Sequence, residues 1–563
     1  MGIPSYFRSM LQKYSDIIQT SLIPSSIDYF FLDFNSILYL SYQKVKDDSS
    51  PLSLETRIIH NAIQQLHEMI HSHIHPRKEI YVSMDGVAPM AKMIQQRSRR
   101  YKSIILEQLC QRFSSNSWIP SHHISPGTRF LSILETELRR YKKQHSFSLK
   151  LILNLSSVAG EGEHKFLSKI RSLCNQQTST IVIYSPDGDL LSLSLLTQKS
   201  NIWIMRIPDS HSPYESVYKT PYIYCSIDKI KEHLSSSFSL PLSPHLIQDY
   251  NILLMLAGND FVSSLPYLKI RSKGLDRLIR IYQSLLQNET HFRFIEENQQ
   301  LNLTSLLTLF ECLELTETED LKREWKRFQR DSYGMTDRQR ELSELSMTPC
   351  ELFSSRLQHL SFFHPDHPLF HQYGQLWKSI QLDHPQWKDQ FHSYFFPERP
   401  WDDSFQEEIV CNYIESLVFT WLYYTKQCPS YSWYYRFRMA PLPSDIVRVL
   451  RKHHQTWQYS IVQSFFEDTT QPYLPFEQLL YILPPSGRFL LPSCLQTKIL
   501  SHPQFYPSEN SVLLDALSGG KFIYSETLLP PLNISLLQEW VKESTSLYTR
   551  NEQKRNLLTM RLS

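Results

Sequence analysis

The sequence lacks paired cysteines, long apolar runs and a signal peptide. Its eight cysteines are scattered singly and none forms a CxxC pair, which argues against a structural zinc site and favours a reducing compartment. No apolar run reaches the length needed to cross a bilayer, and the first residues lead directly into an amphipathic stretch. We therefore expect a soluble protein with no membrane partner, located in the cytoplasm, with the nucleus as an alternative.

The sequence also lacks a charge imbalance. There are 58 Lys and Arg residues against 56 Asp and Glu residues, so the formal net charge is +2. This balance excludes a protein coated in basic charge, but it is compatible with a local basic groove. Because 563 residues are too many for one core of ordinary size, we expect two or more structural units.

Apolar runs rich in β-forming residues alternate with helical patterns in the first half of the chain. The runs are 27–34, 79–84, 149–155, 180–185 and 202–206, and the helical patterns are 54–72, 87–113, 128–144 and 161–174. Strands that are apolar on both faces and alternate with helices are typical of an α/β fold, with a mostly parallel central sheet flanked by helices. In such folds ligands bind at the carboxyl ends of the strands.

The second half of the chain favours helices. A highly charged, helix-prone stretch leads into it, and a helical pattern at 406–425 precedes the aromatic segment CPSYSWYYRFRMAP. We predict four units along the chain. They are an α/β domain at 1–315, a charged helical connector at 316–345, a largely helical second region at 346–535, and a C-terminal helix or tail at 536–563.

Acidic residues stand where the predicted strands end. They are Asp33, Asp85, Glu161, Glu163, Asp187 and Asp189, joined by Asp260 after an apolar, helix-like run. A single Asp in this position usually caps a turn or a helix, but seven carboxylates at one sheet edge repel one another unless cations offset their charge. Oxygen ligands without His or Cys partners select Mg²⁺ or Mn²⁺. Two such ions can activate water and stabilise the leaving oxygen of a phosphodiester.

A series of basic and amide side chains follows Asp85 in the sequence. Lys92, Gln96, Arg99 and Arg100 are spaced i, i+4, i+7 and i+8, so they share one face of a helix. Such a face is often only a solvated surface. Beside a metal site, however, three cations and one amide donor suit the recognition of a terminal phosphate.

These segments resemble the Xrn family of processive 5′→3′ exoribonucleases through most of the chain. The first conserved block of the family is matched by FLDFNSILY, MDGVAPMAKMIQQRSRR, GEGEHK, SPDGDL and LAGNDFVSSLP. The second block is matched by YIESLVFTWLYYTKQCPSYSWYYRFRMAP and LLYILPPSGRFLLP. The resemblance implies a catalytic core of the flap-nuclease (PIN) type, with the helical second region wrapped against it.

The resemblance also implies a role for each of these residues. The seven carboxylates would hold two Mg²⁺ ions, for which Mn²⁺ can substitute, and Lys92, Gln96, Arg99 and Arg100 would hold a 5′-monophosphate. The family pattern has a base-stacking His where this sequence has Tyr39, and tyrosine can stack on a base as well. Its aromatic partner is expected to be Trp433, with Tyr431 as the alternative.

The predicted function is therefore processive 5′→3′ degradation of single-stranded RNA that carries a 5′-monophosphate, with nucleoside 5′-monophosphates as products. The expected partner is this RNA, since the resemblance implies a preference for decapped or cleaved RNA; decapping factors are a further candidate partner, and the protein is expected to be a monomer. Two alternatives are a structure-specific 5′ nuclease acting on DNA, like the flap endonucleases, and a catalytically inactive RNA-binding scaffold.

Overall fold

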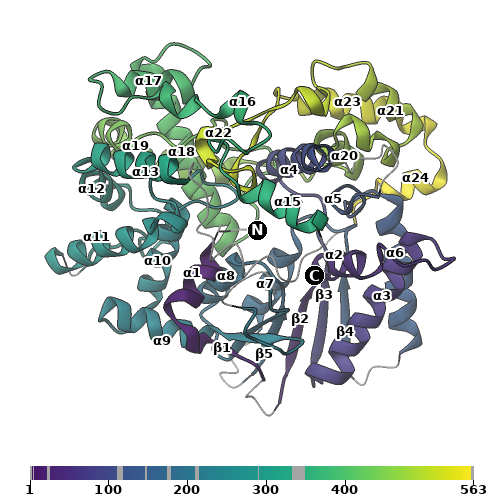
Figure 1. Ribbon diagram of the computed structural model, residues 1–563. Helices are drawn as coiled ribbons and strands as arrows, with labels where there is room; N and C mark the ends of the chain where they lie inside the picture. The colour runs from purple at the N-terminus through teal and green to yellow at the C-terminus, as the bar shows by residue number, and fades with distance from the viewer. Residues whose placement is uncertain are drawn as a thin grey trace.

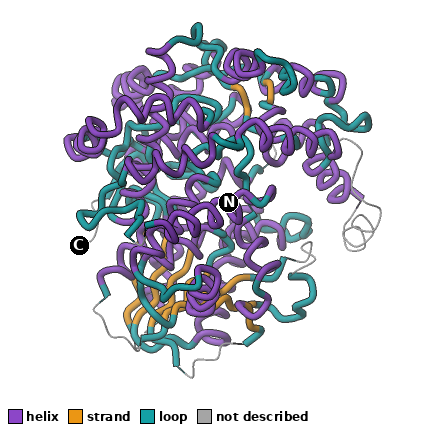
Figure 2. Tube along the Cα trace, turned by 90° about the vertical axis from the view of Figure 1, so that its left-hand side faces the viewer, coloured by secondary structure: helices purple, strands orange, loops and turns teal. Residues whose placement is uncertain are grey.

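The computed structural model describes residues 3, 5–21, 26–110, 118–145, 149–173, 179–209, 215–289, 291–331 and 349–559. The sheet lies at one end of the molecule and a helical part at the other, as two views at right angles show (Figure 1 and Figure 2). Within these residues no helix is both long and apolar enough to span a membrane.

The main sheet contains seven strands in the described part of the chain, in the order β1-β7-β6-β5-β2-β3-β4. The five parallel strands all arise from the predicted apolar runs, and they are β2 (Tyr29–Asp33), β3 (Glu79–Ser83), β4 (Lys150–Asn154), β5 (Ile181–Tyr184) and β6 (Ile202–Arg206). Two further strands, β7 (Ile223–Ser226) and β1 (Ile18–Gln19), extend one edge in antiparallel fashion. The prediction of a mostly parallel sheet is confirmed, and the antiparallel edge adds to it.

Alternate side chains of each parallel strand fill two separate cores. Phe31 and Ile183 belong to the core on one face, whereas Phe30, Leu32 and Val182 belong to the core on the other. This is the period-two alternation of a pleated strand that is covered on both sides. The carboxyl ends of these strands are therefore the place where polar side chains can reach a ligand.

Helices cover both faces of the sheet. The first face is covered by α1 (Tyr6–Lys13), α7 (Gly162–Ser172), α8 (Asp189–Leu196), α9 (Ile227–Phe238) and α10 (Pro244–Leu256). The second face is covered by α2 (Phe34–Val45), α3 (Leu54–Glu68) and α6 (Arg129–Gln144). The predicted helices at 54–72, 128–144 and 161–174 are thus present.

Helix α4 (Met90–Leu109) leaves the sheet and enters the helical part of the molecule, where it packs against α20 (Pro475–Ile482) (Figure 1). The Ala88 N–H donates to Gln478 Oε1 at 2.8 Å just before α4 begins. The Arg97 guanidinium donates to the carbonyl oxygens of Pro530 and Phe505 at 2.7 and 2.6 Å. Helix α4 is therefore fixed by both halves of the chain.

The remainder of the described chain is mainly helical. Its helices are α5 (Pro120–His123), α11 (Gly274–Asn288), α12 (Leu303–Glu314), α13 (Glu317–Asp331), α15 (Pro349–His359), α16 (Phe370–Tyr373), α17 (Trp387–Phe395), α18 (Asp403–Thr425), α19 (Pro443–Glu467), α21 (Ser493–Leu500), α22 (Ala516–Gly519), α23 (Ile534–Ser544) and α24 (Arg550–Arg555). Two short strands, β8 (Leu513–Leu514) and β9 (Thr527–Leu528), pair in antiparallel fashion. Residues 332–345 of the predicted connector lie outside the described residues.

The two halves of the chain share core packing. The larger core contains both Phe166 of α7 and Leu417 of α18. At the other end of the chain, Arg555 Nε donates to the Gly127 carbonyl at 2.7 Å. The helical part thus packs on the sheet part through α18 and through its C-terminal end. The division of the chain at residue 315 stays a prediction.

Candidate active site

The carboxyl end of β2 places Asp33 at the start of α2. Asp33 is the N-cap of this helix, and its carboxylate accepts a hydrogen bond from the Asn35 N–H at 3.1 Å. Asn35 also reaches the residue that follows β3: its side-chain amide donates to Asp85 Oδ2 at 3.0 Å. One capping motif therefore orients two carboxylates.

Asp85 follows β3 and lies against the start of α7. The Gly162 N–H donates to Asp85 Oδ1 at 2.8 Å, and the Gly86 N–H donates to the Gly160 carbonyl at 2.9 Å. Lys165 Nζ, one turn into α7, donates to the Met84 carbonyl at 2.7 Å. These bonds connect the loop after β3 to the loop after β4, so that Asp85 is fixed next to the GEGEHK segment.

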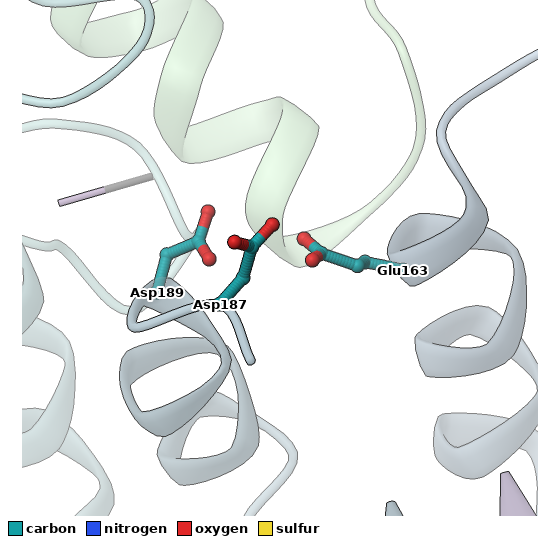
Figure 3. Close-up of side chains that lie close together, drawn as sticks. All are labelled: Glu163, Asp187 and Asp189. Atoms are coloured by element: carbon teal, nitrogen blue, oxygen red, sulfur yellow. The ribbon is translucent and has the colours of Figure 1, made fainter. Parts of the chain in front are cut away.

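Three of the seven predicted carboxylates converge closely. Glu163 comes from the first turn of α7, and Asp187 and Asp189 come from the turn between β5 and α8 (Figure 3). Each offers an oxygen that lies within 4.8 Å of the oxygens of the other two. Helix α18 contacts α8 beside them.

Burial and then mutual repulsion raise the pKa of two carboxyls of the trio, Glu163 and Asp189. Burial, followed by the charges of Asp189 and Asp187, raises the pKa of Glu163 well above its usual range. Burial and then Asp187 raise the pKa of Asp189 to about 7. Burial, Asp85 and Asp187 likewise raise the pKa of Asp33, which connects the trio to the end of β2.

The donor set of the trio fits a divalent cation. Its ligands are carboxylate oxygens without a histidine or cysteine, and Asp189 Oδ1 is buried without a hydrogen-bond partner in the described part of the chain. A cation would offset the repulsion that, together with burial, raises the pKa values of Glu163 and Asp189, and it would give the orphaned oxygen a partner. Glu163, Asp187 and Asp189 are therefore a candidate metal centre.

Two of the other four predicted acids, Glu161 and Asp260, pair with the basic helix. Lys92 Nζ forms ion pairs with Glu161 Oε2 and, at 2.7 Å, with Asp260 Oδ2. Arg99 Nη2 contacts Asp260 Oδ1 at 3.2 Å, and the Gln95 side chain donates to the same oxygen. Burial would raise the pKa of Asp260, but Lys92 and Arg99 outweigh it and hold this pKa well below its usual range.

The predicted phosphate-binding face of α4 is thus adjacent to the carboxylates. Arg100 Nη2 donates to Ser125 Oγ at 2.7 Å, while its Nε is buried without a partner among the described residues. The side-chain amide of Gln478 donates to Gln96 Oε1 at 3.3 Å. Two of the four predicted residues, Lys92 and Arg99, contact an acid of the site directly, and the other two are held by neighbouring elements.

The two predicted stacking residues differ in their surroundings. Tyr39 lies on α2 and is 42% exposed, and its hydroxyl is under the electrostatic influence of Arg100 and Asp85. Trp433 is half-buried, with one face stacked on Phe419 at 4.6 Å between ring centroids and its Nε1–H donating to Glu415 at 3.0 Å. Tyr39 therefore lies between the acids and the basic helix, whereas Trp433 lies at the edge of the aromatic core.

Some residues of the site carried no signal in the sequence. Asn35 and Lys165 lie inside matched motifs, but nothing in the sequence pattern indicates which groups they bond to. Tyr423, on α18, is separated from Glu161 by 262 positions, and its hydroxyl donates to Glu161 Oε1 at 2.8 Å. Only the fold could show that this residue of the second region reaches the acidic site.

Comparison with known proteins assigns the chain to a family. The family model described as "XRN 5'-3' exonuclease N-terminus" matches residues 1–207. The model described as "Xrn1 helical domain" matches residues 244–356 and 355–561. The chain belongs to the Xrn family. The resemblance in the motifs and the helical character of the second half are both confirmed by these matches.

Curated Xrn relatives align over nearly the whole chain. The protein named "5'-3' exoribonuclease 1" from Schizosaccharomyces pombe is 25% identical, over 99% of this chain and 49% of that protein. The "5'-3' exoribonuclease 2 homolog" from Drosophila melanogaster is 23% identical, over 94% of this chain and 69% of that protein. The "5'-3' exoribonuclease 2" from Gallus gallus is 24% identical, over 99% of this chain and 71% of that protein. The chain thus spans about half the length of the first relative.

A solved structure titled "The catalytic core of Rad2 in complex with DNA substrate (complex III)" aligns with a TM-score of 0.30 and 12% identity, over 62% of this chain and 86% of that chain. This similarity is too low to bear on function.

The close approach of the loops after β3 and β4 makes Gly86 sensitive to substitution. A Cβ atom at Gly86 would overlap the Val158 carbonyl oxygen, whereas a Cβ at Gly188 would meet only ordinary contacts, of 3.6 Å or more. Gly86→Ala is expected to destabilise the protein by about 3 kcal/mol or more, and Gly188→Ala by about 0.5 kcal/mol or less. Denaturant unfolding of both variants measures this, and equal midpoints would contradict the close approach.

Binding of a divalent cation to the trio is expected to depend on pH. Because the pKa of Asp189 is raised to about 7, a cation has to displace its proton below that pH. Displacement of one such proton makes the apparent Mn²⁺ affinity rise about tenfold from pH 6 to pH 8. Calorimetric titration at pH 6, 7 and 8 measures this, with Asp189→Asn as the variant that weakens binding and loses this proton. An affinity that is constant with pH would refute the assignment.

Proposed function

We propose that this Xrn-family chain is a 5′→3′ exoribonuclease that degrades single-stranded RNA with a 5′-monophosphate, one nucleotide after another. The observation that carries the proposal is the contact between the basic face of α4 and the acidic site, through Lys92 and Arg99. A phosphate bound on this face lies next to carboxylates that suit divalent cations. The names of the three curated relatives above, each a 5'-3' exoribonuclease, agree with this activity.

The proposed cofactor is a pair of Mg²⁺ ions, for which Mn²⁺ can substitute. Bound there, the ions would supply an activated water and would stabilise the charge on the leaving oxygen. Glu163, Asp187 and Asp189 would hold them together with Asp33, Asp85 and Glu161. Asp260 would contribute from the side of the basic helix, where Lys92 and Arg99 keep it ionised.

The side chains of α4 would hold the 5′ end. The guanidinium groups of Arg99 and Arg100 provide planar donors for phosphate oxygens, and Lys92 provides a compact charge. Arg100 is buried and contacts Ser125, so its position is fixed before RNA binds. A second or third phosphate would bring further charge toward Asp85 and Asp260, and the proposed site therefore favours a monophosphate over a triphosphate or a cap.

Tyr39 would stack on the terminal base. It lies on α2 next to Arg100, and its ring is 42% exposed, so a base can reach its face. Trp433 has one face covered by Phe419 and would contribute its remaining face. Stacking of the first bases would draw the strand forward after each cleavage and thereby support processive degradation.

A comparison of 5′ ends tests the proposed function directly. Wild-type protein in Mg²⁺ is expected to degrade 5′-phosphorylated RNA much faster than 5′-hydroxyl RNA or flapped DNA of the same sequence. Arg99→Gln should lower kcat/KM on 5′-phosphorylated RNA by about 10- to 100-fold, because a charged hydrogen bond contributes about 1.5–3 kcal/mol. The same variant should change the rate on 5′-hydroxyl RNA little.

The matched control is Arg140→Gln, which removes an exposed arginine of α6 that pairs only with Glu137 in the described residues and should leave both rates unchanged. Equal rates of the wild type on all three substrates would overturn the end-recognition proposal. Preference for flapped DNA would favour the structure-specific nuclease instead.

Removal of two acids separates catalysis from binding. Asp187→Ala combined with Asp189→Ala should lower the cleavage rate by at least about 1,000-fold, because the proposed metal centre loses two of its three ligands. Binding of 5′-phosphorylated RNA, measured by fluorescence anisotropy in Ca²⁺-free, Mg²⁺-free buffer, should persist because α4 is unchanged. A wild type that binds RNA but shows no Mg²⁺-dependent cleavage would instead support the scaffold alternative.

A further inference from the structure

The carboxylate of Glu161 is held from two sides by residues of different parts of the chain. Oε2 pairs with Lys92 of α4, and Oε1 accepts a hydrogen bond from the Tyr423 hydroxyl at 2.8 Å. Tyr423 lies near the C-terminal end of α18, in the helical part of the molecule, and its side chain is buried. The helical part therefore contacts a proposed metal ligand directly.

The ring of Tyr423 is fixed by three other rings. The His164 ring lies 3.9 Å away between centroids at an interplanar angle of 34°. Phe261 meets the Tyr423 ring edge-on at 5.1 Å, and Phe419 stacks on it at 5.8 Å and 22°. Because these contacts surround the ring, the hydroxyl has little freedom to turn away from Glu161.

We propose that Tyr423 is a positioning residue that fixes the Glu161 carboxylate for metal binding, so that the docked helix α18 completes the acidic site. This inference rests on the proposed function only in assigning Glu161 to the metal centre. The Tyr423 hydroxyl donates to the Glu161 carboxylate. Its effect passes through Glu161.

A donor is needed at this place because Lys92 competes for Glu161. Lys92 is within ion-pair distance of both Glu161 and Asp260, and without a second partner the carboxylate is free to turn wholly toward the ammonium group. The hydrogen bond from Tyr423 keeps one oxygen on the α18 side, while Gly162, the next residue, bonds Asp85. Outer contacts of this kind orient ligands and raise the affinity of metal sites.

Another tyrosine of the same helix serves as the internal comparison. Tyr413 is fully buried on α18, and its hydroxyl has no hydrogen-bond partner among the described residues. It lies ten positions before Tyr423, or about 15 Å along the helix axis. Tyr413→Phe therefore removes a buried hydroxyl from α18 without touching an acid of the site.

The test is the Mn²⁺ affinity of Tyr423→Phe, measured by calorimetric titration without RNA. The variant should bind Mn²⁺ about tenfold more weakly than the wild type, and Tyr413→Phe should bind it as the wild type does. In cleavage assays the Mg²⁺ concentration for half-maximal rate should rise by a similar factor in Tyr423→Phe. Saturating Mg²⁺ should restore kcat, and the KM for RNA should stay unchanged.

A double-mutant cycle shows whether the effect passes through Glu161. If it does, Tyr423→Phe should add nothing to the loss of Mn²⁺ affinity caused by Glu161→Gln. Additive losses would overturn the positioning role, as would a wild-type affinity in Tyr423→Phe or an equal loss in Tyr413→Phe.

The test remains decisive if Tyr423→Phe is less stable, because the rise in melting temperature that Mn²⁺ causes in each protein also reports its affinity, and this rise should be smaller in Tyr423→Phe than in the wild type and in Tyr413→Phe. A wild type that binds Mn²⁺ but degrades no RNA would refute the proposed function alone, since the affinity comparison needs no substrate. A wild type that degrades RNA while Tyr423→Phe keeps full Mn²⁺ affinity would refute the inference alone.

Discussion

Repulsion among carboxylates at one edge of a parallel sheet is the constraint on which the rest of this structure depends. Parallel strands bring their carboxyl ends to the same edge, and here they bring Asp33, Asp85 and Asp187 within electrostatic reach of one another. Burial and this repulsion raise the pKa of Asp33 and oppose its ionisation, and positive charge nearby offsets such a rise. Part of that charge is built into the chain as Lys92 and Arg99, which keep Asp260 ionised. At Asp189 burial and the charge of Asp187 still raise the pKa to about 7 although Lys92 acts in the opposite direction, and a divalent cation among the three carboxylates would offset this repulsion.

This constraint explains why α4 is anchored in both halves of the molecule. A basic helix that approaches an acidic site closely would pair with it completely unless other contacts fixed its position. The contacts of Arg97 with Pro530 and Phe505 and of Ala88 with Gln478 provide that fixation from the helical part. Arg100 faces away from Asp260 toward Ser125. By fixing the position of α4, the helical part thus limits how closely the basic side chains of this helix approach the acids, so that they would remain available to a phosphate.

The sequence predicted the parallel strands and the acids because both depend on local patterns. Apolar runs of five or six residues specify buried strands, and a parallel sheet then fixes where the acids after them must lie. The antiparallel strands β1 and β7 are short and depend on pairing between distant segments, so no local pattern distinguishes them. The same holds for the site. Glu163, Asp187 and Asp189 converge as the strand ends require, whereas the contacts of Tyr423 with Glu161 and of Lys92 with Asp260 join segments 262 and 168 positions apart.

Tyr39 occupies the point where these two charge systems meet, and its chemistry suits that place. The family pattern has histidine at this position, and an imidazole between carboxylates and arginines would change its charge near neutral pH. The phenol of Tyr39 stays neutral near neutral pH, because its pKa is raised above the usual value. Burial is the largest cause; Asp85 and Asp33 act in the same direction, and Arg100 and Arg99 act against them. A neutral ring adds no charge to a place that lies under the influence of both Arg100 and Asp85. Stacking on the first base would then depend on the shape and polarisability of the ring alone, while recognition of the 5′ end would remain with the cations of α4.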